Sequence, residues 1–242
     1  MKLDATQAQL ESEVVRTPEG IRRRYRENKH WRYYPKEWIY KNIPLEGKEI
    51  LDFGCGTGEI TTQLAFLGAK RVYALDVTRG LLDSTRRRAE LDGVADRVEI
   101  ICGTVQEVEP RPVDVIIAYA VLHHCFPLEN IVPALMRWLK PEGLFIAVEP
   151  VSYLKSLEYL RNHSGVPYDP LDEGERKLNS EDLQYVSGMV AESRFVHFHI
   201  LGRLARLWPG GDPVFRRFDQ LILRLPFSWK LAGTALIVGR HL

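Results

Sequence analysis

Apolar and polar residues form two different patterns in the middle of this chain. Continuous apolar runs, such as Val113–Tyr119, are typical of strands that are buried on both faces of a sheet. Between these runs, apolar residues recur every three or four positions, which is the period of a helix that packs one face on a core. The strands predicted in this region are 49–53, 71–75, 97–102, 113–119 and 144–149, and the helices are 57–67, 78–91 and 128–139.

Strands that alternate with helices predict a parallel, doubly wound sheet, because each crossover places a helix on one face of the sheet. The alternation changes after Pro150. Two further helices, at 153–162 and 180–188, precede strands at 194–201 and 232–238. The predicted fold class is therefore α/β with a doubly wound, seven-stranded sheet. In such sheets, ligands bind outside the carboxyl ends of the parallel strands.

Residues 1–47 differ from the rest of the chain in their dense aromatic and charged content. A helical cap packed on the core is predicted for this segment, and its aromatic rings can also face a ligand. The domains expected are this cap over 1–47 and an α/β domain over 48–242. The second domain contains a helical insert at 201–230, between the last two strands.

Composition narrows the class of protein. The 242 residues are 45% apolar, which suffices for one domain with a buried core, and the net charge of +1 gives no reason to expect nucleic acid as a partner. Cys55, Cys102 and Cys125 are odd in number and share no disulfide or metal spacing, which fits reduced thiols. The sequence shows no apolar signal segment and no membrane-spanning run, so a cytoplasmic location is expected.

Glycines alternate at Gly54, Gly56 and Gly58, between the first strand and its helix. Glycine at these places lets a strand turn sharply into a helix and lets a ligand lie on the backbone. A P-loop is excluded because no lysine stands where it is required. A dinucleotide fingerprint fails because Glu59 occupies the place of its last small residue. Asp52 would repel a pyrophosphate, but it suits a ligand that carries an ammonium group.

S-adenosylmethionine (SAM) has such an ammonium group and a ribose diol. Asp76 lies 18 residues past Gly58, where a carboxylate can accept both ribose hydroxyls. The segment ILDFGCGTG, followed by Asp76, by VDVIIAYAVLHH and by LKPEG, resembles the class I SAM-dependent methyltransferases. Within them it is similar to the small-molecule branch of methyltransferase type 11. The resemblance is strongest over residues 48–149.

This resemblance implies the strand order 3-2-1-4-5-7-6, with a final antiparallel strand beside the fifth. It also implies SAM as the methyl donor and S-adenosylhomocysteine as the product. Thr104 stands where the family often has Asp or Asn. The residues that the resemblance assigns to the donor follow the first four strands, and they are Asp52, Gly54, Cys55, Gly56, Gly58, Asp76, Val77, Thr104, Val105, Ala118, Tyr119 and Ala120.

Methyl transfer from a sulfonium is an in-line displacement, so an enzyme mainly supplies proximity and alignment. An oxygen or nitrogen acceptor also needs a base that removes its proton. The catalytic candidates are His123 and His124, which follow the fourth strand, and Glu149 at the end of the fifth. A structural role is the alternative for each. No metal site is expected, because His197 and His199 share a strand face but lack a third ligand.

The expected acceptor is a small or medium organic molecule. Its predicted contacts are Tyr25, Tyr33, Tyr34, Glu149 and Tyr153. Two other functions remain open at this point. One is methylation of a macromolecule, either RNA or protein, and the other is a non-catalytic scaffold that binds SAM.

The insert at 201–230 combines apolar residues with several arginines and a lysine. Three interpretations are open: a cap on the core, a dimer contact, or a peripheral contact with a membrane surface. The chain is expected to be a monomer or a homodimer.

Overall fold

The computed structural model describes residues 34–163, 175–202, 204, 207–208 and 211–241. Most of the cap predicted for residues 1–47 lies outside these described residues, and helix α3 (Tyr34–Asn42) is the part of its predicted helical structure that is described. The described chain forms two compact units. The first comprises residues 44–119 and 137–143, and the second comprises residues 34–43, 120–136 and the described residues from 144 onward.

The first unit is built on four parallel strands. These are β1 (Glu49–Phe53), β2 (Arg71–Asp76), β3 (Val98–Cys102) and β4 (Val113–Tyr119). Ile50 of β1 is in register with Val72 of β2 and with Val115 of β4, and all three side chains are buried, as expected for strands covered on both faces. Helices α4 (Glu59–Phe66) and α5 (Arg79–Leu91) contact each other and β2, and the 3-10 turn η2 (Ala95–Arg97) leads into β3.

The second unit is antiparallel. Residues 144–150 of β5 (Leu139–Pro150) pair with β7 (Thr234–Arg240), and β7 pairs with β6 (Ala191–Phe198). The other elements of this unit are η3 (Leu122–His124), α6 (Leu128–Met136), α7 (Lys155–Asn162), α8 (Ser180–Gly188), α9 (Asp212–Ile222) and η6 (Ser228–Leu231). Helix α9 lies within the predicted insert. None of the described helices is long and apolar enough to span a membrane.

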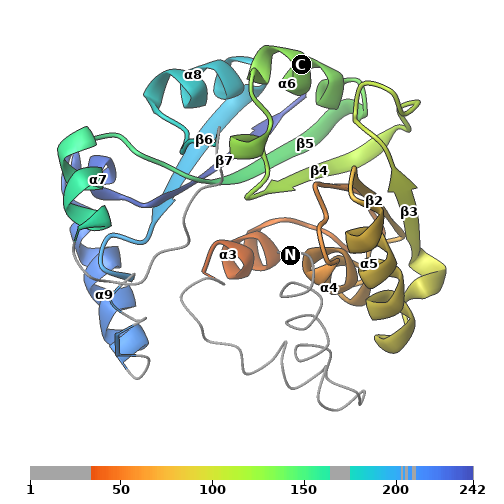
Figure 1. The fold of residues 1–242 in the computed structure, drawn as a ribbon, viewed down its shortest axis with the longest axis horizontal. Coiled ribbons are helices and arrows are strands. Elements are labelled where there is room, and N and C mark those ends of the chain that lie inside the picture. The colour runs from red at the N-terminus through yellow and green to blue at the C-terminus, as the bar shows by residue number, and fades with distance from the viewer. Residues whose placement is uncertain (1–33, 164–174, 203, 205–206, 209–210, 242) are drawn as a thin grey trace. The chain divides into compact units, whose positions relative to one another are not determined.

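The strand order through the sheet is β3-β2-β1-β4-β5-β7-β6 (Figure 1). The prediction of an α/β fold with seven strands in this order, the last of them antiparallel, is therefore confirmed.

Two strand starts differ from the prediction by three residues or more. The sequence Lys140-Pro-Glu-Gly143 was expected to be a turn, but it belongs to β5, which begins at Leu139. Backbone pairing already starts one residue earlier, since the N–H of Val113 donates to the carbonyl of Trp138. Within this stretch of β5, Glu142 has a left-handed backbone conformation. Strand β6 begins at Ala191, before the predicted start at residue 194, because a bulge between Ala191 and Arg194 interrupts the alternation.

Candidate active site

The turn from β1 into α4 is made of glycines with a left-handed backbone. Gly54, Gly56 and Gly58 have φ angles of 67°, 54° and 76°. A Cβ atom on Gly58 would lie only 2.6 Å from the methyl group of Thr85, so this position excludes any side chain. Among the described residues, nothing lies within 4 Å of the corresponding point on Gly56. The backbone at Gly56 is therefore open to a ligand.

The carboxylate of Asp76 is held against this glycine loop. One oxygen accepts a hydrogen bond from the N–H of Gly56 at 2.9 Å, and the other accepts one from the N–H of Thr78 at 2.8 Å. The hydroxyl of Thr85 donates to the carbonyl of Gly56 at 2.9 Å. The acid and the loop that were predicted to hold the two ends of SAM are thus joined directly.

Asp52 and Cys55 lie beneath the loop rather than on it. The side chain of Asp52 is buried and accepts a hydrogen bond from the hydroxyl of Thr61 at 2.5 Å, which ties the end of β1 to the first turn of α4. Burial, with the nearby charges of Asp52 and Asp76, raises the pKa of the Cys55 thiol, so Cys55 is protonated. Contact of Asp52 with the methionine end of the donor stays a prediction.

Three residues that the resemblance assigns to the donor, Val77, Thr104 and Val105, follow β2 and β3. Val77 is 64% exposed, whereas Val105 is buried. The hydroxyl of Thr104 donates to the carboxylate of Glu107 at 2.8 Å. Glu107 was missed by the sequence analysis, because it lies in a turn where no periodic pattern marks it. Its carboxylate supplies an acceptor next to Thr104.

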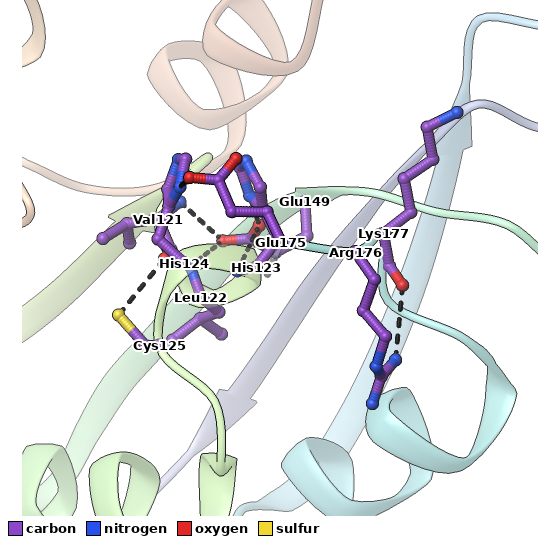
Figure 2. Close-up of polar contacts among 9 residues, drawn as sticks. All are labelled: Val121, Leu122, His123, His124, Cys125, Glu149, Glu175, Arg176 and Lys177. Atoms are coloured by element: carbon purple, nitrogen blue, oxygen red, sulfur yellow. Dashed lines mark hydrogen bonds and ion pairs between the residues drawn. The ribbon is translucent and has the colours of Figure 1, made fainter. Parts of the chain in front are cut away.

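His123 is oriented by a buried carboxylate. Glu149 is buried, and one of its oxygens accepts hydrogen bonds from the N–H groups of Val121 and Leu122 at 2.9 and 2.7 Å. The other lies 2.8 Å from Nδ1 of His123 (Figure 2). With both oxygens engaged, Glu149 positions the histidine and the turn η3. The sequence analysis had placed Glu149 at the rim, as a base or a substrate contact.

His124 has a carboxylate partner of its own. Its Nδ1 lies 2.6 Å from an oxygen of Glu175, and its ring centroid is 3.9 Å from that of His123 (Figure 2). The side chain of His124 is 45% exposed, against 9% for His123. Glu175 is the second residue that the sequence analysis missed. It lies 51 residues from His124, in an acidic loop without periodicity.

The chain after Glu175 is anchored on both sides. Arg176 bonds to Asp182 of α8 at 2.8 Å, and its guanidinium lies 4.0 Å from the ring centroid of Phe126. Leu178 is buried and forms an isolated bridge with Val151. These contacts fix the backbone that presents Glu175 to His124.

The remaining predicted contacts fall in a separate group. Tyr153 is hydrogen-bonded to Nε2 of His197 at 2.8 Å and packs edge-to-face on Trp229. Burial raises the pKa of the Tyr153 hydroxyl and lowers the pKa of His197, so both groups are neutral near pH 7. His199 is bonded through Nδ1 to the hydroxyl of Thr234 at 2.8 Å. Each of the two strand histidines is thus hydrogen-bonded to a hydroxyl group of the protein.

A cleft of about 540 Å³ lies between α3, β6 and α9, all in the second unit. Tyr34 lines it. The guanidinium of Arg216 lies over the ring of Tyr34, 4.3 Å from the ring centroid. The same ring stacks on His199, which also lines the cleft. Tyr25 and Tyr33, the other predicted aromatic contacts from the cap, lie outside the described residues.

Comparison with known proteins gives a family match over part of the chain. Residues 51–147 match the family model of the methyltransferase domain. Protein arginine N-methyltransferase 6 of Danio rerio is 37% identical over 114 residues, which are 45% of this chain and 32% of that protein. Ribosomal protein L11 methyltransferase of Acinetobacter baumannii (strain AYE) is 31% identical over 148 residues, which are 59% of this chain and 46% of that protein. The chain thus spans less than half the length of these curated relatives.

Solved structures resemble a larger part of the chain, at low sequence identity. Geranyl diphosphate C-methyltransferase from Streptomyces coelicolor A3(2), in complex with Mg²⁺, geranyl diphosphate and S-adenosyl-L-homocysteine, has a TM-score of 0.61 and 13% identity over 86% of this chain and 77% of that one. The [4+2]-cyclase SpnF has a TM-score of 0.60 and 18% identity over 87% of this chain and 81% of that one. These likenesses establish the fold, and the two names show that the fold serves more than one chemistry.

Proposed function

We propose that this chain, which belongs through residues 51–147 to the methyltransferase domain family of the class I SAM-dependent methyltransferases, transfers a methyl group from SAM to a small or medium organic acceptor. SAM is the donor, and S-adenosylhomocysteine is the product. The glycine loop and Asp76 would hold the donor, because the backbone at Gly56 is open and the carboxylate beside it is already oriented. Val77, exposed next to Asp76, would lie against the adenine.

The observation that carries the acceptor class is the cleft between α3, β6 and α9. Its volume of about 540 Å³ falls within the range of small-molecule sites, roughly 300 to 1,000 Å³. Its lining mixes aromatic rings with polar groups, as at Tyr34, Trp38 and His199.

The histidine pair would activate the acceptor. The carboxylate on Nδ1 of His124 favours the tautomer whose Nε2 carries the lone pair, and it stabilises the imidazolium that forms when a proton is taken up. We assign the base to His124, since its side chain is exposed and that of His123 is not. Glu149 and His123 would position the turn. Methyl transfer would then proceed by in-line attack on the donor sulfonium carbon.

Protein methylation is the second candidate, and the curated relatives support it because both are protein methyltransferases by name. Incubation with methyl-labelled SAM and a cell extract, followed by separation by size, tells the two apart. We expect the label in the small-molecule fraction. Label confined to protein or RNA would refute the acceptor class, and donor binding without any transfer would indicate a non-catalytic protein.

Asp76→Ala supplies the negative control for that experiment. The substitution removes a charged acceptor, so calorimetry should show donor binding about 10- to 100-fold weaker. Asp83→Ala, which changes an exposed aspartate of α5, should leave donor binding and labelling unchanged. Equal donor affinity for the Asp76→Ala variant and the unsubstituted chain would contradict the ribose assignment.

A further inference from the structure

Helix α9 presents a stripe of apolar side chains to solvent. Val214, Phe218 and Leu221 stand at positions i, i+4 and i+7, and Phe218 and Leu221 are 51% and 57% exposed. At about 100° per residue, these three positions occupy roughly 60° of the helix circumference. Leu225 is exposed in the turn that follows.

The opposite side of α9 is firmly attached to the second unit. Asp219 is buried, and its carboxylate accepts the N–H groups of Leu201 and Ile200 at 2.6 and 3.1 Å. Arg216 is bonded to Glu37 of α3 at 2.7 Å. Of the interpretations open for the insert, a cap on the core therefore describes the inner side of this helix. It leaves the exposed stripe unexplained, because the helix is fixed with its apolar side outward.

Cations and exposed aromatic rings border the stripe. Arg217 is exposed on one flank of it, roughly 70° around the helix axis from the middle of the stripe, and Arg224 is exposed in the turn after the helix. Exposed Trp208 precedes α9, and Phe227 follows it. Among the described side chains of residues 211–230, the acid is Asp219, and it is buried. The surface is thus apolar in its middle and cationic at its edge.

We propose that this α9 surface, made of Trp208, Val214, Arg217, Phe218, Leu221, Arg224, Leu225 and Phe227, docks the protein on an anionic lipid bilayer. The apolar stripe would enter the headgroup region, and the arginines would extend to the lipid phosphates. Arg224 also lines the cleft between α3, β6 and α9, so this surface adjoins the proposed acceptor site. The contact does not depend on which acceptor is methylated.

A lipid surface fits these residues better than a second copy of the chain does. A two-fold dimer through this surface would bring the same patch against itself and place its arginines near one another. An anionic bilayer instead neutralises each arginine, and each one near the membrane should strengthen binding by about fivefold. Binding should therefore require anionic lipid and weaken as salt screens the charges.

Vesicle co-sedimentation of the full chain tests the proposal. We expect binding to phosphatidylcholine vesicles that contain 30% phosphatidylglycerol, and at least tenfold weaker binding to phosphatidylcholine alone. Phe218→Ser with Leu221→Ser should weaken binding at least tenfold, and Arg217→Gln with Arg224→Gln should remove the preference for anionic lipid. Phe66→Ser with Leu67→Ser is the matched control. It changes an exposed Phe at the end of α4 and the exposed Leu that follows it, and it should have no effect.

Three outcomes would overturn the proposal. In the first, the unsubstituted chain binds neither vesicle. In the second, the variant with Phe218→Ser and Leu221→Ser binds as well as the unsubstituted chain. In the third, sedimentation velocity without lipid shows that the unsubstituted chain is a dimer and that the variant with Phe218→Ser and Leu221→Ser is a monomer, while neither of the two binds to vesicles. Circular dichroism of each variant checks that the fold is kept, which is expected because every altered side chain is exposed.

Discussion

At the scale of single residues, the two histidines after β4 differ in access to an acceptor. His124 is exposed and bonded to Glu175, whereas His123 is enclosed and bonded to Glu149. Replacing His124 by Gln should lower kcat about 10²- to 10⁴-fold, because glutamine cannot accept the proton, while donor affinity stays the same. Steady-state kinetics across pH, with calorimetry of donor binding, measures both effects.

Two companion variants sharpen this test. Glu175→Gln should lower kcat less than His124→Gln and change the shape of the pH profile, since it removes the charge that stabilises the imidazolium. His163→Gln alters another exposed histidine, at the end of α7, and should leave kinetics unchanged. Full activity of His124→Gln at every pH would show that His124 is not the base.

The residues of the candidate site were predictable to different degrees. The glycines and Asp76 stand at strand ends, where backbone geometry demands particular residue types, so one sequence suffices to find them. Glu175 could not be found in this way. Its backbone is followed by Arg176 and Leu178, whose contacts with Asp182 and Val151 position it near His124, and the pairing joins segments far apart in the chain. No local pattern encodes such a meeting.

At the scale of elements, the turn from β1 into α4 depends on Gly58. Alanine there would meet Thr85 and would also have to adopt a left-handed backbone, which costs about 1–2 kcal/mol by itself. Gly58→Ala should therefore lower the free energy of unfolding by about 2 kcal/mol or more in urea titrations.

Gly80→Ala is the matched control for Gly58→Ala. Gly80 lies inside α5, and no atom of the part of the chain that the structure describes lies within 4 Å of a new Cβ atom, so alanine there should stabilise by about 0.5–1 kcal/mol. If both substitutions changed stability by the same amount and in the same direction, the argument from backbone and space at Gly58 would be wrong.

Element types were easier to predict than their ends. The long apolar run of β4 identifies it as a strand, and the helical period of apolar residues in α5 identifies it as a helix. The start of β5 was misjudged because Pro141 and Gly143 are typical of turns, whereas pairing near Trp138 extends the strand through them. Hydrogen bonds between distant strands outweigh local preference here.

At the scale of the whole molecule, a charge network joins three distant stretches of the first unit. The ammonium of Lys140 lies 3.0 Å from a carboxylate oxygen of Glu49 and 3.0 Å from one of Asp114. Asp114 also accepts the N–H of Glu49 at 2.8 Å. The starts of β1, β4 and β5 are thus tied together, which makes the network a contributor to global stability that depends on pH.

The direction of the pH dependence follows from the pKa values of these groups. Hydrogen bonds from Lys140 and Lys70 hold the pKa of Glu49 below its usual value. Burial opposes ionisation of Asp114, but the N–H of Glu49 and the ammonium of Lys140 hold its pKa below the usual value as well. Both carboxylates therefore stabilise the fold above their unfolded pKa, about 4, and this stabilisation is lost as the pH falls through their folded pKa values.

Lys140→Met should accordingly lower the melting temperature at pH 7 by about 2–4 °C, the shift expected for about 1 kcal/mol in a chain of this size. The difference from the unsubstituted chain should shrink below about pH 3, because protonated carboxylates no longer attract Lys140. Lys70→Met removes a more exposed lysine, paired with Glu49 but with no second carboxylate among the described residues, so its effect should be smaller. Differential scanning calorimetry from pH 2.5 to 8 measures both series. A Lys140→Met effect of constant size across this range would mean that lost packing of the lysine stem, rather than the charge network, accounts for the destabilisation.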